Sequence, residues 1–205
     1  MTRLWWALER ASRGVRFALY FDSGRPKMLR FPFDEKKALE ALVLIASDWP
    51  GVTSFYASKV VFFSDKWHLN RFGRPVVGDR YIAMDNGPVP SVIYDWFKGN
   101  LDRMGDPDAI IDAVEFNRND RYVKATARRE PDLSVLSESD IESVREAVAY
   151  CKRFTVSQLS RITHNDPAWR AAILNDEMDP ALMIEGEHRE GRVEIAREFA
   201  VYGVG

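Results

Sequence analysis

The sequence predicts a mostly α-helical α+β fold, arranged as a single compact domain with a small antiparallel sheet. Several segments place apolar residues at helical spacing between a capping residue and a glycine or proline stop. One pair of short segments flanks a cluster of turn-forming residues, which is typical of a β-hairpin. The length of 205 residues and the hydrophobic fraction of 46% suit one well-filled domain.

The first thirty-three residues predict a short helix followed by a hairpin. Residues 4–11 carry apolar side chains at helical spacing, and residues 15–21 alternate as a strand does. The cluster 22–26 predicts a turn, and residues 28–33 are then expected to return as a second strand. This region is also basic: residues 1–30 hold seven basic and two acidic side chains.

Two helices are expected next. Asp34 can cap a helix that ends at Pro50-Gly51, because its carboxylate accepts from free N–H groups of the first turn. Ser54 offers the following cap, before the apolar run of residues 60–68. Four consecutive bulky side chains in this run indicate burial on several sides, and the segment's length favours a central helix ended by residues 73–75.

The middle of the chain predicts short strands and one helix. Residues 76–84 are expected to form a strand with a break at Gly78. Two prolines within 86–90 predict that this segment has no regular structure. Pro90 then suits the first turn of a helix that ends at Gly99-Asn100.

A polar loop and a hairpin are expected after that helix. Residues 102–108 are polar and predict the loop, whereas residues 110–116 and 121–127 carry the apolar side chains of two strands. The connection between those strands is Asn117-Arg118-Asn119-Asp120, which is rich in turn-forming residues.

The last third of the chain is expected to be helical. Ser137 with Asp140, and Thr155 with Gln158, have the spacing of capping boxes. Asp-Pro pairs at 166–167 and 179–180 then combine a capping residue with proline at the first helical position. The chain therefore divides into an N-terminal extension, a main domain and an acidic C-terminal helix or tail, with the boundaries 1–33, 34–178 and 179–205.

Composition argues against several classes of protein. The formal net charge of −2 gives no signal for nucleic acid, and no run approaches the roughly 20 apolar residues of a membrane helix. Cys151 is the single cysteine and lies on the apolar stripe of its helix, which predicts a buried, inert thiol. A reducing cytoplasm is the expected location.

No catalytic or metal-binding motif is present in the sequence. His68, His164 and His188 lack the spacing of metal ligands, which favours structural histidines. Asp65 and Asp79 resemble paired carboxylates, although contacts to backbone are the commoner use of aspartate beside a turn. We therefore predict no cofactor, no metal and no enzymatic activity, while an active site assembled from distant residues stays an alternative.

Two regions suggest binding. Residues 155–174 have the outline of a helix-turn-helix, which would make the protein a DNA-binding autorepressor with Arg170 as its base reader. The flanking Asp176-Glu177 makes this segment a poor match to phosphate, so an ordinary helical hairpin is favoured. The second region, 66–97, mixes aromatic residues with arginine as interface hot spots do, although many of these aromatics are expected in the core.

Several motifs in order resemble one known family. They are Lys59 to Leu69, Gly73 to Met84, Gly87 to Tyr94, Leu136-Ser137-Glu138-Ser139-Asp140, and Leu159 to His164 followed by Trp169. Together they resemble the Panacea (SocA-like) antitoxin domain of type II toxin–antitoxin systems. That domain has a lysine-led helix, a Gly-x-Pro strand start, and a Gly-Pro-Val turn before a helix with tyrosine. The resemblance covers about residues 36–175.

This resemblance implies a bacterial or phage antitoxin that binds and neutralises a cognate protein toxin by direct contact. An adaptor that delivers the toxin to a protease or its unfoldase is the alternative mechanism; a membrane partner is not expected, and nucleic acid is not favoured. The expected partner-binding residues are Trp5, Trp6, Lys66, Trp67, Arg80, Tyr81, Gly87, Pro88, Val89, Tyr94 and Trp96. The family motif serves equally well as structure, with Gly87 and Pro88 holding a turn. The variable residues 1–33 are expected to choose the toxin.

Overall fold

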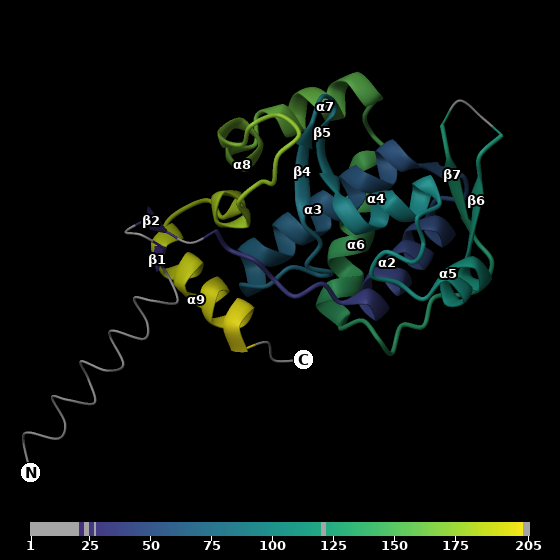
Figure 1. Cartoon of the computed structure of the whole chain (residues 1–205), viewed down its shortest axis with the longest axis horizontal. Coiled ribbons are helices and arrows are strands. Elements are labelled where there is room, and N and C mark those ends of the chain that lie inside the picture. The colour runs from purple at the N-terminus through teal and green to yellow at the C-terminus, as the bar shows by residue number, and fades with distance from the viewer. Residues whose placement is uncertain (1–20, 23–24, 27, 120–121, 203–205) are drawn as a thin grey trace, which may run out of the picture.

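A buried helix, α3 (Ser54–Phe72), runs through the centre of the molecule and contacts both helices and strands of the domain. The computed structural model describes residues 21–22, 25–26, 28–119 and 122–202 (Figure 1). Thr53, rather than the expected Ser54, caps α3 through its hydroxyl, and Gly73 ends the helix with a φ of 75°. The predicted central helix is thus confirmed, and the described elements form one mostly helical α+β domain.

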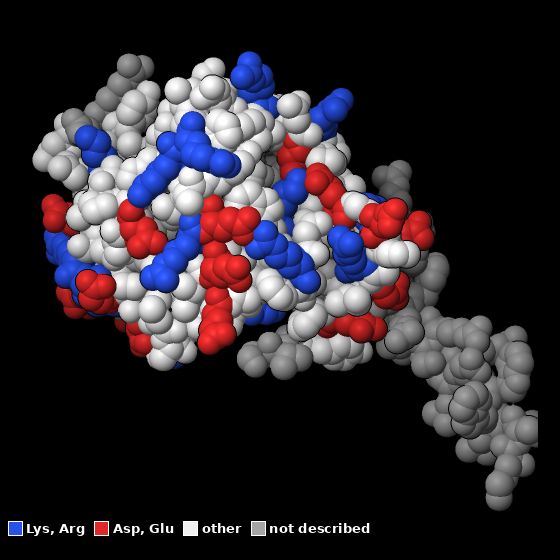
Figure 2. All heavy atoms as spheres, turned by 180° about the vertical axis from the view of Figure 1, so that it is seen from behind, with Lys and Arg blue, Asp and Glu red and all other residues white. Residues whose placement is uncertain are grey.

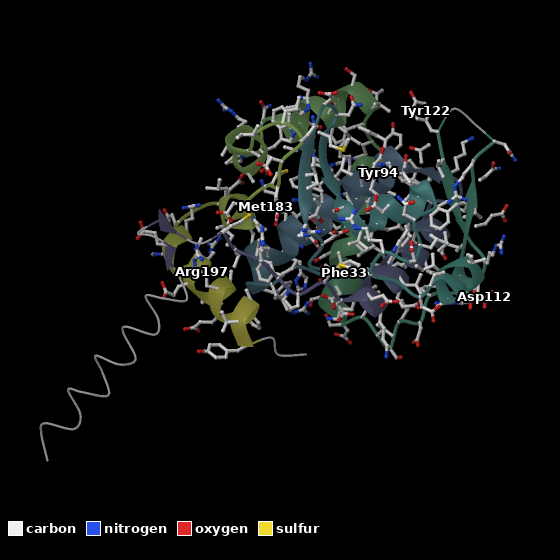
Figure 3. The ribbon with its side chains drawn as sticks, viewed as in Figure 1. Phe33, Tyr94, Asp112, Tyr122, Met183 and Arg197 are labelled. Atoms are coloured by element: carbon white, nitrogen blue, oxygen red, sulfur yellow. The ribbon has the colours of Figure 1, made fainter. Side chains whose placement is uncertain are left out.

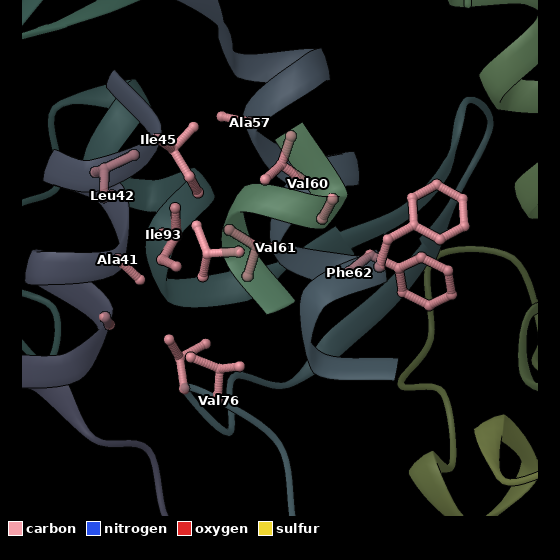
Figure 4. Packing of buried hydrophobic residues seen from close by; sticks show 14 of the residues in the cluster. Ala41, Leu42, Ile45, Ala57, Val60, Val61, Phe62, Val76 and Ile93 are labelled. Carbon is pink, nitrogen blue, oxygen red and sulfur yellow. The ribbon is translucent and has the colours of Figure 1, made fainter. Parts of the chain in front are cut away.

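Two helices pack against α3 to form most of the core. These are α2 (Glu35–Asp48) and α6 (Glu138–Cys151), and each begins at its predicted cap. The Asp34 carboxylate accepts from Lys37 N, while Ser137 and Asp140 form the complete capping box. Figure 4 shows Leu42 and Ile45 of α2 facing the apolar side chains of α3. The burial of these side chains from water is the main stabilising term.

A three-stranded antiparallel sheet lies at one end of the domain. Its order is β3 (Val52–Thr53), β7 (Lys124–Ala127) and β6 (Val114–Asn117). The hairpin predicted around residues 117–120 is confirmed, but its first strand is shorter than expected. Residues 107–113 form a helix, α5 (Pro107–Ala113), because Asp106 caps it and Pro107 occupies its first turn.

The β4–β5 hairpin corrects another expectation. Residues 86–90 were expected to be irregular, yet β5 (Gly87–Pro90) pairs with β4 (Tyr81–Met84). The backbone of Tyr81 and Ala83 in β4 faces away from β5: Tyr81 O accepts from Met178 N, and Ala83 exchanges hydrogen bonds with residues 175 and 176. Their strand partners Pro90 and Pro88 therefore also lie at positions that make no hydrogen bond to β4. Proline is tolerated there because no ladder hydrogen bond is lost.

Residues 76–80 do not continue β4 as predicted. The backbone N–H groups of Val76 and Val77 both donate to Asp65 Oδ1, at 2.9 and 3.0 Å. Asp79 accepts from Val92 N and Ile93 N at the start of α4 (Ser91–Lys98). Both aspartates therefore accept hydrogen bonds from backbone N–H groups, as expected of aspartate near a turn. The bonded groups lie eleven to fourteen residues further along the chain.

Short helices complete the domain. Thr155 and Gln158 form the predicted capping box of α7 (Val156–His164). The two Asp-Pro pairs open α8 (Pro167–Ala171) and the 3-10 helix η1 (Pro180–Met183). The acidic C-terminal segment contains α9 (Arg189–Tyr202), which lies against the end of α3 near Gly73. No helix of the described residues is long and apolar enough to cross a membrane.

The N-terminal prediction is corrected in its second strand. A two-residue pairing joins β1 (Phe21–Asp22) to β2 (Arg25–Pro26), which places the hairpin earlier than expected. Residues 28–33 form no strand; Leu29 N instead donates to Asp179 Oδ1 at 3.2 Å, and Leu29 is buried. The expected helix over 4–11, and most of the strand over 15–21, lie outside the described residues.

Asp65 gives the fold a testable pH dependence. Burial raises the pKa of its carboxyl from 3.8 to about 7, although Val76 N, Val77 N and the Tyr81 hydroxyl all donate to it. Between these pKa values the folded protein holds a proton that the unfolded chain has lost, so stability falls as pH rises through this window. Burial also raises the pKa of Asp79, to about 6, which acts in the same direction.

We therefore predict that Asp65→Asn flattens the pH dependence of the free energy of unfolding across this window. One such proton changes that free energy by at most about 1.4 kcal/mol per pH unit. An asparagine amide can donate to the Tyr81 hydroxyl, which then donates to Val61 O, so the variant should fold. Urea unfolding at several pH values measures this, with Asp112→Asn on the exposed face of α5 as the control. Identical slopes for both variants would contradict the assignment.

Candidate functional site

A groove of about 500 Å³ opens between the first turns of α3 and the tip of the β4–β5 hairpin. We call it the hairpin groove. It is lined by Thr53, Ser54, Phe55, Tyr56, Ser58, Lys59, Met84, Asp85, Asn86, Val89, Tyr94, Tyr122 and Val156. Most of its aromatic walls are half-buried, so they present rings to the groove while their backbones stay packed. A concave apolar surface with few polar groups is the usual form of a binding site.

Four separate elements bring the groove together. The Thr53 cap begins α3 so that Phe55 and Lys59, one helical turn apart, face the same side. Tyr94 comes from α4, and Tyr122 follows the turn between β6 and β7; Figure 3 labels both on the same side of the domain. Val156, the first residue of α7, completes the rim and is 46% exposed.

Lys59 lies at the floor of the groove and is almost completely buried. Its Nζ donates to Pro88 O at 2.8 Å and lies 5.1 Å from the centre of the Phe55 ring. Burial lowers the pKa of this amine to about 7. The neighbouring Cys151 thiol has its pKa raised to about 12 by burial, so it is neutral and offers no balancing charge.

Gly87 is required at the hairpin for two reasons. Its φ of 96° is a conformation that glycine adopts without strain. A side chain at this position would also overlap the Thr163 hydroxyl and come within 3.0 Å of Lys59 Nζ. Gly87 therefore lets the hairpin lie directly on α3 and α7.

A second hollow continues from the hairpin groove along α7. It shares Asn86 and Val156 with the groove and adds Ser157, Ser160, Arg161, His164 and Asn165. The His164 ring stacks on Trp169 with ring centres 3.9 Å apart, and the Trp169 indole donates to Met84 O. These contacts join α7, α8 and the hairpin into one continuous surface.

The structure separates the residues that the sequence predicted for partner binding. Val89 and Tyr94 line the hairpin groove, whereas Gly87 and Pro88 are buried in the β5 strand beside it. Tyr81 and Trp96 are 2% and 0% exposed, so their side chains belong to the core. Sequence alone could not separate core aromatics from surface ones in this region.

Lys66, Trp67 and Arg80 do not line the groove. Lys66 is occupied by ion pairs to Asp166 and Glu185, at 2.6 and 2.7 Å. Trp67 is half-buried against other aromatic rings, and Arg80 is exposed. Trp5 and Trp6 lie outside the described residues, so their part in partner binding stays a prediction.

Only Val89 and Tyr94 of the groove were predicted from the sequence as site residues, and the others were missed, among them Phe55, Lys59, Tyr122 and Val156. They come from segments separated by up to a hundred residues, which no local spacing connects. Lys59 did give a signal, because it is a charged residue at the head of an apolar run. A lysine in that position is almost never buried without a specific reason.

His68 makes hydrogen-bond contacts through both of its ring nitrogens. His68 donates from Nδ1 to Arg74 O at 2.8 Å, and its Nε2 lies 3.0 Å from Ser139 Oγ. Burial lowers the pKa of His68, and the nearby Asp140 carboxylate pairs with Arg74. Within the described part of the chain, no group of three or more His, Cys, Asp or Glu side chains could hold a metal ion.

The helix-turn-helix outline also has a structural explanation. The second helix of the pair, α8, is only five residues long, and its capping Asp166 is paired with Lys66. A recognition helix must reach base edges with several side chains along a groove. The pair α7–α8 instead packs against the hairpin and η1.

Comparison with known protein families assigns the chain. The model of the family described as "Antitoxin SocA-like, Panacea domain" matches residues 58–170, more than half of the chain. The chain belongs to this family. Neither the comparison with curated proteins nor the comparison with solved structures gives a match. The matched region contains Lys59, the β4–β5 hairpin, Tyr94, Tyr122 and Val156, so most of the hairpin groove lies within the antitoxin-like domain.

We predict that Gly87→Ala destabilises the protein far more than the same change at Gly51. Both glycines have positive φ, which costs alanine about 1 kcal/mol, but a side chain at Gly51 meets nothing within 4 Å. At Gly87 the overlap with Thr163 should raise the total cost to about 3 kcal/mol. Thermal or urea unfolding of both variants measures the difference, and equal losses would show that Gly87 serves φ alone.

Proposed function

We propose that this protein is a type II antitoxin that binds and neutralises a cognate protein toxin by direct contact. Membership of the SocA-like antitoxin family is the observation that carries this proposal. The hairpin groove, extended by the hollow along α7, is the proposed contact surface. We place the pair in the cytoplasm, which suits a chain whose single cysteine is a buried free thiol.

The hairpin groove has the properties of a preorganised docking surface. The hairpin is held by the pairing of β4 with β5, by the Lys59–Pro88 hydrogen bond and by Trp169, so little entropy is lost on binding. Its aromatic walls supply the side-chain types that dominate protein interfaces. Tyr122 and Val156 are 53% and 46% exposed at the rim, where a partner would cover them.

Charge supports a protein partner over nucleic acid. Figure 2 shows basic and acidic side chains interspersed over one face, without a large basic patch. Binding to phosphate backbone needs clustered lysine and arginine, and the net charge of the chain is −2. The charge distribution therefore favours a protein partner, and the non-catalytic role that we propose rests on the family membership.

The direct test is growth of bacteria that express this chain together with the product of its neighbouring gene. Each protein is also expressed alone. The proposal predicts that the neighbour is toxic alone and harmless in the pair, and that the two proteins co-purify. An unchanged toxin level during rescue supports blocking, whereas a lowered level that depends on a protease supports the adaptor mechanism. Undiminished toxicity in the presence of folded chain would contradict the antitoxin proposal.

We predict that Val156→Asp abolishes or strongly weakens neutralisation without unfolding the protein. The change places a charge at the apolar rim of the groove, while an acidic residue in the first turn of α7 favours the helix. Ile111→Asp on α5 is the matched control, because Ile111 is 45% exposed and lies outside the groove. Growth rescue measures both variants; equal rescue would exclude Val156 from the interface.

The N-terminal extension is proposed to choose the toxin, because it is basic and contains Trp5 and Trp6. Leu29 is buried and Arg30 pairs with Glu177, so a deletion should stop before them. We predict that removal of residues 1–20 leaves the thermal stability of the domain unchanged but abolishes rescue. The double variant Trp5→Ala/Trp6→Ala should lose rescue as well. Full neutralisation by the folded, shortened chain would contradict this role.

A further inference from the structure

The floor of the hairpin groove holds a buried amine that no acidic group of the described residues pairs with. Lys59 is 1% exposed, and no carboxylate of the described residues forms an ion pair with it. Its Nζ donates to the neutral carbonyl of Pro88, although an ammonium group has three N–H donors. Burying a charge without a partner is costly. The lysine therefore suits a site that receives its counter-charge from outside.

The charges near Lys59 do not supply that counter-charge. Cys151 of α6 is neutral, because burial raises the pKa of its thiol to about 12. His164 of α7 has its pKa lowered by partial burial and by Lys59 itself. Asp85, at the exposed tip of the hairpin, acts on His164 instead. An incoming anion thus meets one buried amine, which it favours in the protonated form, and no carboxylate of the described residues forms an ion pair with that amine.

The edge of the hairpin excludes one mode of peptide binding. A partner strand would need backbone N–H donors on the outer edge of β5, where the outward positions are Pro88 and Pro90. Neither proline has an N–H group, and Pro88 O is already bonded to Lys59. Recognition in the groove must therefore use side chains rather than strand addition.

We propose that the hairpin groove binds an acidic side chain of the partner protein, flanked by an apolar residue, and that Lys59 pairs with its carboxylate. The inference rests on the proposed function and deepens it by naming the chemistry of the partner segment. The half-buried rings of Phe55, Tyr56 and Tyr94 form walls that suit the apolar flank. The four-carbon stem of lysine lets Nζ turn from Pro88 O towards the groove that it lines.

Small probes test this chemistry without the toxin. We would titrate the full chain with 3-phenylpropanoate, with the neutral 3-phenylpropanamide and with phenyl phosphate, and follow the backbone amide NMR signals of Val89, Tyr94 and Val156. The carboxylate should shift these signals and bind at least about tenfold more tightly than the amide. Binding should also take up protons above pH 7, because the pairing raises the lowered pKa of Lys59.

Variants separate the lysine from the walls. Lys59→Met should remove the preference for carboxylate over amide while keeping the fold, since methionine fills the same buried space without a charge. Tyr94→Ala should weaken both probes alike, which keeps the proposal testable if Lys59→Met does not fold. The control is Lys36→Met, an equal loss of charge on the exposed side of α2, and it should bind as the unchanged protein does. Equal binding of acid and amide, preference for phenyl phosphate, or an unaltered preference in Lys59→Met would overturn the inference.

Neutralisation of the toxin distinguishes this inference from the proposed function. Rescue by the unchanged chain that is lost in folded Lys59→Met supports both. Rescue that Lys59→Met retains in full overturns the inference and leaves the antitoxin proposal standing. A chain that binds the carboxylate probe through Lys59 but never rescues growth contradicts the antitoxin proposal and supports the acidic-ligand site alone.

Discussion

The arrangement of this domain depends on polar side chains that one buried helix directs at the β4–β5 hairpin. Asp65 of α3 binds the backbone N–H groups of Val76 and Val77 and the hydroxyl of Tyr81, which sets where β4 can begin. Six residues earlier on the same helix, Lys59 donates a hydrogen bond to Pro88 O of β5. The hairpin is thereby held at both strands, and the groove at its tip inherits that rigidity. The same burial that raises the pKa of Asp65 lowers that of Lys59, so both groups are held at an electrostatic cost that the packing of α3 must offset.

Most helix starts were predictable because capping is local. The caps of α2, α6, α7, α8 and η1 each use a side chain within three residues of the groups it binds. The misses arose where distant groups decide the structure. Residues 76–80 form no strand, because Asp65 binds the backbone N–H groups at the start of this segment. The strand β5 tolerates two prolines only because both lie at positions that make no hydrogen bond to β4. The helix α5 was also missed, although its start is local: Asp106 caps it and Pro107 lies in its first turn, but these residues were assigned to a polar loop.

The site was less predictable than the fold. The family motif includes Gly87 to Tyr94, and Val89 and Tyr94 of this segment line the groove. Tyr81 and Trp96 are aromatic like Tyr94, but their side chains are buried in the core. Which of these aromatic side chains is buried depends on the register of β4 and on the face of α4 that packs inward. Tyr122 and Val156 come from loops and helix ends that are close only in the folded chain. The sequence motifs therefore indicated the hairpin and α4 as parts of the candidate site, whereas tertiary packing determines which of their side chains are accessible in the groove.

The claim that the hairpin groove is the partner surface is tested most directly by amide hydrogen exchange of the antitoxin–toxin complex against the free chain. The account predicts added protection at residues 84–89 and along α7, with α5 unchanged. Protection confined to α5, or to α9 and the C-terminal half of α3, would contradict this claim and would move the interface away from the hairpin groove.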